Sequence, residues 1–137
     1  MIIGIPKEIK TDEYRVSTPP GAVRELVAHG HKVFVQKGAG AGSAFSDDEY
    51  TAAGATIVFE AEEVWKRADM VIKVKEPQKS EYGYMREDLI LFTYLHLAAM
   101  QGLTEEMVKS GVMGVAYGTV EDKLGRLPLL EPMSEVA

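Results

Sequence analysis

Short apolar runs alternate with helical patterns along this chain, and the alternation restricts the fold more than any other feature. The runs are typical of buried strands and lie at residues 2–5, 32–36, 55–59, 69–74, 89–95 and 112–117. Helical patterns separate them, for example at 62–67 and 104–109. Such an alternation predicts an α/β fold with an open, mostly parallel sheet and helices on both faces.

Composition excludes several classes of function. The 137 residues suit one compact domain, and a net charge of −6 argues against a nucleic-acid or anionic-membrane partner. The chain has no cysteine, so we expect no disulfide, no thiolate nucleophile and no cysteine-based metal site, and this composition fits the reducing cytoplasm. We predict no metal ligands among the other residues. The longest apolar stretch, 89–100, is interrupted by Thr93 and His96 and is too short to span a bilayer.

A glycine-rich stretch follows the predicted strand at 32–36. Gly38, Gly40 and Gly42 begin like a dinucleotide-binding loop, but the third glycine of that fingerprint would fall at Ser43. The next predicted helix begins too late to hold a pyrophosphate at its N-terminus. We therefore interpret the stretch as a turn or surface loop rather than a phosphate site.

Two lysines and a histidine stand near the ends of predicted strands. Lys73 and Lys75 are two residues apart on a strand predicted at 70–75, so both are expected on one face. Lys75 at the strand end could hold a carboxylate or a carbonyl oxygen, although a solvated lysine is the commoner case. His96 follows the most apolar strand and could serve as an acid or base, although a buried core histidine is the commoner case.

Arg15 lies in the loop after the first strand, where its guanidinium could bind a carboxylate through two hydrogen bonds. The carboxyl ends of parallel strands meet at one edge of a sheet, and ligands of open α/β sheets bind beyond that edge. Arg15, Lys75 and His96 all follow predicted strands. Two cations and one titratable ring at one edge are consistent with a site for a small 2-oxo acid.

Several motifs, in order along essentially the whole chain, resemble the alanine dehydrogenase family. They are Ile3-Gly-Ile-Pro-Lys-Glu8, Asp12-Glu-Tyr-Arg15-Val16, Val74-Lys75-Glu76-Pro77, Leu91-Phe-Thr-Tyr-Leu-His96-Leu-Ala-Ala99, Leu127-Pro-Leu-Leu130 and Pro132-Met133-Ser134-Glu135-Val136-Ala137. The related transhydrogenase α subunit shares the motifs of Arg15 and Lys75 but usually lacks the histidine. His96 therefore favours the dehydrogenase, with the transhydrogenase component and a non-catalytic 2-oxo acid binding or assembly module as alternatives.

The resemblance implies a function and roles for single residues. The family interconverts L-alanine with pyruvate and ammonia, using NAD, and is expected to act as a cytoplasmic hexamer. Arg15 and Lys75 would bind pyruvate, and His96 would be the catalytic acid and base. Met133 and Ser134 would lie near the nicotinamide of the cofactor.

The resemblance also implies a division into domains. Residues 1–130 would form a Rossmann-like or flavodoxin-like substrate-binding domain. Residues 131–137 would begin the helix that links it to an NAD-binding domain, which these residues do not contain, so the isolated chain is expected to be inactive. One departure from the family pattern is Gly118, where the family usually has a glutamate.

Overall fold

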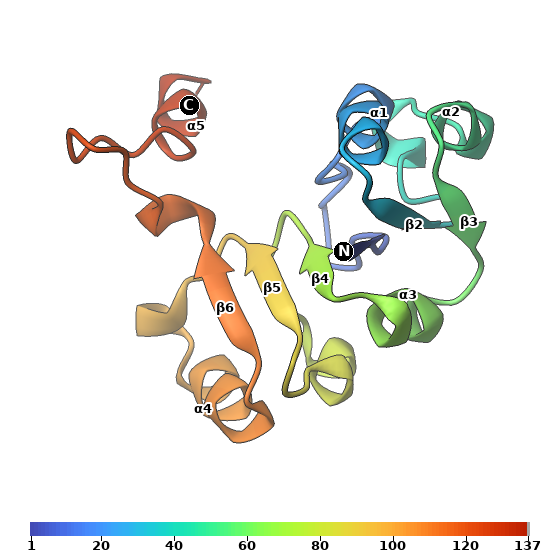
Figure 1. Cartoon of the computed structure of the whole chain (residues 1–137). Coiled ribbons are helices and arrows are strands. Elements are labelled where there is room, and N and C mark those ends of the chain that lie inside the picture. Colours follow the sequence, from blue (N-terminus) through green and yellow to red (C-terminus); the bar gives the residue numbers. More distant parts are fainter. Residues whose placement is uncertain (137) are drawn as a thin grey trace.

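The sheet of this protein has six strands, all parallel, in the order β3-β2-β1-β4-β5-β6 (Figure 1). The computed structural model describes residues 1–136, so Ala137, the last residue of the expected linker helix, lies outside the described residues. The strands are β1 (Ile2–Ile5), β2 (Lys32–Gln36), β3 (Thr56–Val58), β4 (Met70–Ile72), β5 (Ile90–Thr93) and β6 (Met113–Ala116). This is the Rossmann order rather than the flavodoxin order, and the predicted open parallel sheet is confirmed.

Helices cover both faces of the sheet, as predicted. The α-helices are α1 (Pro20–Ala28), α2 (Asp47–Ala52), α3 (Ala61–Arg67), α4 (Gln101–Ser110) and α5 (Glu131–Val136). Short 3-10 helices are η1 (Ala41–Ser43), η2 (Lys79–Tyr84), η3 (Leu97–Ala99) and η4 (Tyr117–Thr119).

The side chains of β2 alternate between two cores because successive residues of a strand point to opposite faces. Val33 and Val35 pack with Val23 of α1 on one face. Phe34, between them, packs with Val64 of α3 on the other face. Burial on both faces explains why this strand is apolar without interruption.

A second core fills the half of the sheet around β4 and β5. Trp65 of α3, Leu91 of β5 and Leu103 of α4 are almost fully buried there. Helix α4 begins three residues before the predicted helix and ends as expected at Gly111, whose φ of +75° favours glycine. This core holds α3 and α4 against the sheet.

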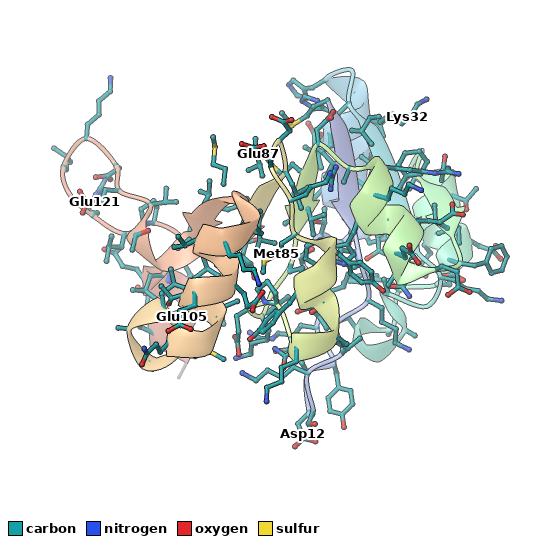
Figure 2. The ribbon with its side chains drawn as sticks, turned by 90° about the horizontal axis from the view of Figure 1, so that it is seen from below. Asp12, Lys32, Met85, Glu87, Glu105 and Glu121 are labelled. Carbon is teal, nitrogen blue, oxygen red and sulfur yellow. The ribbon has the colours of Figure 1, made fainter. Side chains whose placement is uncertain are left out.

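The C-terminal part of the chain packs loosely. No side chain from Val108 to Glu135 is classed as buried. The loop with Glu121 projects away from the rest of the molecule (Figure 2), and α5 lies apart from the sheet (Figure 1). Helix α5 begins at Glu131, where a helix was expected. No helix within residues 1–136 combines the length and apolar character that a membrane crossing requires.

Candidate functional site

The strand order reverses between β1 and β4, and this point of an open α/β sheet is where a crevice forms at the carboxyl edge. The loop that carries Arg15 follows β1, and the loop that carries Lys75 follows β4. In Figure 2, Asp12 of the first loop lies on the opposite side of the molecule from Lys32, which begins β2 at the amino edge. The two loops therefore lie where the topology predicts a ligand.

Arg15 and Lys75 line one hollow of about 390 Å³, together with residues 10–14. This volume is in the range of small-molecule sites. Lys10 also lines the hollow but is already paired with the buried carboxylate of Glu76 at 2.5 Å. The predicted convergence of Arg15 and Lys75 is what the structure shows.

The Arg15 guanidinium is oriented by Glu13. Arg15 Nε donates to Glu13 Oε2 at 2.9 Å and Nη2 donates to Oε1 at 2.6 Å, a two-point contact. The hydrogen bond from Arg15 holds the pKa of Glu13 below its usual value against the effect of burial, and the charge of Lys75 lowers it further. The remaining guanidinium N–H groups are available to a ligand.

Lys75 has a fixed backbone and a half-buried side chain. Its backbone N–H donates to Glu8 Oε1 at 2.7 Å, and its carbonyl accepts from the Thr93 hydroxyl at 2.9 Å. The ion pairs found within residues 1–136 leave the Lys75 ammonium without a carboxylate partner. A ligand anion in the hollow could provide one.

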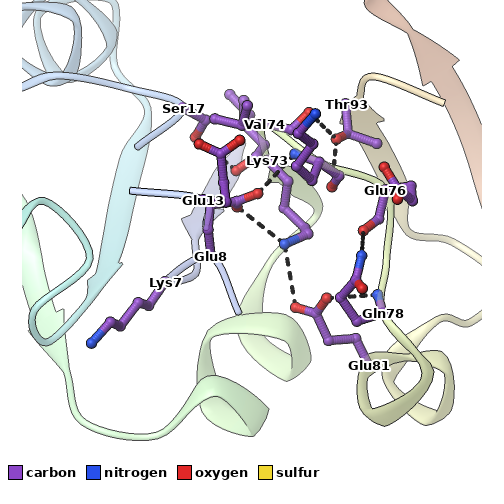
Figure 3. A network of polar contacts seen from close by, with 12 residues as sticks. Lys7, Glu8, Glu13, Ser17, Lys73, Val74, Glu76, Gln78, Glu81 and Thr93 are labelled. Atoms are coloured by element: carbon purple, nitrogen blue, oxygen red, sulfur yellow. Dashed lines mark hydrogen bonds and ion pairs between the residues drawn. The ribbon is translucent and has the colours of Figure 1, made fainter. Parts of the chain in front are cut away.

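Lys73 does not share the face of Lys75, so this prediction was wrong. Strand β4 ends at Ile72, before either lysine. The Lys73 side chain is 1% exposed and pairs with Glu8 at 3.1 Å and Glu81 at 3.4 Å (Figure 3). The strand pattern could not reveal this, because both acidic partners lie elsewhere in the sequence.

His96 follows β5 at the same edge, immediately before η3, and is exposed rather than part of the core. It is not among the residues that line the hollow of Arg15 and Lys75. Its charge acts on Glu76: burial raises the pKa of Glu76, but the hydrogen bond and charge of Lys10, with the charge of His96, bring it below its usual value. The structure thus brings Arg15 and Lys75 together and places His96 on the neighbouring strand end.

A second hollow, of about 550 Å³, adjoins Arg15 and is mainly apolar. Three of its walls are aromatic: the rings of Phe92 and Tyr94 lie 4.3 and 4.7 Å from that of Tyr117. Met133 lines this hollow, whereas Ser134 is exposed and is not part of the lining.

The sequence analysis missed these aromatic walls. The spacing of Phe92 and Tyr94, two residues apart at a strand end, was the available signal, because such residues share a face. Tyr117 comes from the neighbouring strand end, and only the sheet order brings it beside them.

The glycine-rich stretch supports the loop of Arg15. A Cβ atom at Gly42 would lie 2.5 Å from the Tyr14 carbonyl oxygen, and the Ser43 hydroxyl donates to that same oxygen at 3.1 Å. The stretch leads into a 3-10 turn and not into an α-helix. These contacts agree with the interpretation as a turn rather than a phosphate site.

Two other features bear on the site. Within residues 1–136, no three His, Cys, Asp or Glu side chains converge as ligands for a metal ion. A Cβ atom added at Gly118 would meet nothing within 4 Å.

Topology and site together define the class: an α/β domain of Rossmann topology with a hollow that Arg15 and Lys75 line at the switch point of its sheet. The chain belongs to the family described as alanine dehydrogenase/PNT, N-terminal domain, which matches residues 4–137.

Individual relatives agree with this assignment. An alanine dehydrogenase of Staphylococcus saprophyticus is 58% identical over all of this chain and 37% of its own length. A solved L-alanine dehydrogenase superposes with a TM-score of 0.96 at 50% identity, over 100% of this chain and 38% of that one. A transhydrogenase from Sinorhizobium meliloti superposes with a TM-score of 0.81 at 28% identity, over 90% of this chain and 36% of that one. The chain thus spans about 37% of the length of the curated relatives it matches.

Proposed function

We propose that this chain is the substrate-binding part of an NAD-dependent alanine dehydrogenase, an oxidoreductase that converts L-alanine reversibly to pyruvate and ammonia. The observation that carries the proposal is the shared hollow of Arg15 and Lys75 at the switch point of the sheet. The relatives named alanine dehydrogenase support it, because their identity to this chain is much higher than that of the transhydrogenase.

In this proposal, the residues of the chain bind the substrate and move its protons. Arg15 binds the substrate carboxylate through the N–H groups that Glu13 does not use. Lys75 holds the oxygen atoms of pyruvate by hydrogen bonds and charge. His96 gives a proton to, or takes one from, the oxygen of the reacting carbon, a role that suits an imidazole near neutral pH.

The residues around the apolar hollow fit one part of NAD, its nicotinamide ring. Aromatic walls and Met133 offer an apolar contact for such a ring, and Ser134 follows Met133 on α5. The chemistry that NAD supplies when bound is acceptance of a hydride from the substrate Cα. The described residues lack a glycine loop that opens an α-helix, so we assign the pyrophosphate to a domain outside these 137 residues.

We further infer that residues 1–130 form the substrate domain and that 131–137 begin the link to the cofactor domain. The absence of cysteine supports a cytoplasmic enzyme. The family resemblance implies that the protein assembles as a homo-oligomer, namely a hexamer.

Binding of pyruvate to the 137-residue chain tests the substrate site directly. We expect a saturable shift of the His96 ring signals in NMR spectra, and its loss in Arg15→Ala and Lys75→Ala. Lys66→Ala is the matched control, because Lys66 is an exposed lysine of α3 outside the hollow. A folded chain without a shift contradicts a preformed substrate site.

Activity is tested in a chimera in which this chain replaces the matching part of the Staphylococcus saprophyticus relative. We expect formation of NADH that depends on L-alanine, and a loss of about 100-fold or more in His96→Ala, as for removal of a general acid or base. A chimera whose activity survives His96→Ala contradicts the assigned role.

A further inference from the structure

Lys73 and Lys75 follow the same strand but have opposite surroundings, and Glu8 contacts both residues. The Lys73 ammonium is buried between two carboxylates that are 3% exposed, Glu8 and Glu81 (Figure 3). An ion in the interior is costly unless charge and hydrogen bonds compensate it. Such a cluster is weak evidence for stability, because apolar residues of similar size often serve a core as well. Its geometry indicates a different role.

The two oxygens of Glu8 have separate partners. Glu8 Oε2 accepts from Lys73 Nζ at 3.1 Å, and Oε1 accepts from the backbone N–H of Lys75 at 2.7 Å. Glu8 therefore pairs with the buried Lys73 through one oxygen and holds the backbone of Lys75 through the other. Only a side chain with an acceptor at position 8 can make the second contact.

The segment around Lys75 is also held from the side of β5. The backbone N–H of Tyr94 donates to the Val74 carbonyl at 3.2 Å, and the Thr93 hydroxyl contacts the Val74 and Lys75 carbonyls at 3.1 and 2.9 Å. Glu8 supplies the contact from the side of β1. Lys75 thus has a backbone held by both neighbouring strands and a side chain at the hollow of Arg15.

We propose that Glu8 is a positioning residue for Lys75: its carboxylate, which also pairs with the buried Lys73, holds the Lys75 backbone so that the ammonium lies at the hollow of Arg15. The effect on the substrate rests on the function proposed above. Small displacements of a binding group weaken a site strongly, so the loss of this contact should reduce affinity without removing any group that touches the ligand.

Two double variants of the 137-residue chain isolate the contact. Glu8→Gln with Lys73→Met keeps an acceptor for the Lys75 N–H, whereas Glu8→Leu with Lys73→Met removes it. Both variants remove the buried charges of Glu8 and Lys73. Burial already raises the pKa of Glu81, so this carboxylate takes up a proton more easily when Lys73 is absent. Glu62→Gln on the exposed face of α3 is the control for loss of a carboxylate.

NMR gives two independent readouts: the order parameters of the Lys75 backbone and side chain, and the Kd for pyruvate. We expect the Leu variant to lose order at Lys75 and to bind pyruvate about 10-fold more weakly or worse, and the Gln variant to stay within about 3-fold of the original chain. Unchanged order at Lys75 in the folded Leu variant overturns the proposal. Lost order with an unchanged Kd also overturns it.

The remaining outcomes are also decisive. If the original chain does not bind pyruvate, the proposed function fails, while the order of Lys75 still decides whether Glu8 positions it. If the Leu variant does not fold, a scalar coupling across the hydrogen bond between the Lys75 amide nitrogen and the Glu8 carboxyl carbon is measured in the original chain. Its presence supports the proposal, and its absence overturns it.

Discussion

Single buried polar groups fix the local geometry of this domain, and Tyr50 is a clear case. Its hydroxyl donates to the Thr18 carbonyl at 2.8 Å, just before α1. We expect Tyr50→Phe to lower the free energy of unfolding by about 1–2 kcal/mol, because the carbonyl loses its partner in a buried place. Urea unfolding followed by the fluorescence of Trp65, the only tryptophan, measures this. A change of less than about 0.3 kcal/mol in the free energy of unfolding would contradict this prediction.

The same pair of proteins gives a pH control. Burial raises the pKa of Tyr50 to about 12 from its ordinary 10. A raised pKa stabilises the fold fully below the ordinary value, and this contribution disappears as the pH rises through the raised one. The stability difference between the original chain and Tyr50→Phe should therefore shrink between pH 10 and 12.

Glu13 predicts the opposite pH dependence. The hydrogen bond from Arg15 lowers its pKa from the ordinary 4.5, so its contribution is present above 4.5 and is lost as the pH falls through the lowered value. We expect Glu13→Gln to lower the free energy of unfolding by up to about 1 kcal/mol at pH 7. The effect is small because solvent screens the partly exposed Arg15. The free energies of unfolding of the two proteins, measured as the pH is lowered, should converge below pH 4.5. Parallel curves would show that Glu13 does not titrate in this way.

At the scale of elements, the glycine turn and the loop of Arg15 depend on each other. Gly42→Ala would bring a methyl group against the Tyr14 carbonyl oxygen, which belongs to backbone and cannot turn aside. We expect the loop to shift, with pyruvate binding weakened about 10-fold, because a displaced Arg15 loses its alignment. Gly21→Ala, whose added atom meets nothing within 4 Å, is the matched control in the same titration.

The sequence predicted the bounds of a strand correctly where a single apolar run and its flanking residues were enough to define them. The bounds of β1 and β2 were predicted correctly, because an apolar run and the proline or glycine after it suffice. The end of β4 was predicted too late, at Lys75 rather than Ile72, and the burial of Lys73 between carboxylates from other parts of the chain was not visible in the sequence. In the site, Arg15 and Lys75 followed from strand ends, whereas the aromatic hollow required knowledge of which strands are neighbours.

Across the whole molecule, stability is distributed unevenly. The strands β1, β2 and β4 have apolar clusters on both faces, whereas no side chain from Val108 to Glu135 is buried. We expect amide hydrogens of residues 120–135 to exchange at least about 100-fold faster than those of β1 and β4, because poorly packed segments open without global unfolding. Native-state hydrogen exchange by NMR measures this, and uniform protection along the chain would disprove it.

The position of β1 at the centre of the sheet has a consequence for biosynthesis. Ile3 pairs on one side with Val33 and on the other with Met70. As the ribosome extends the chain, β1 and β2 emerge early, but the other edge of β1 has no partner until β4 has left the exit tunnel. Until then the nascent chain carries an open apolar strand edge, an interval in which chaperones can bind and wrong pairings can form.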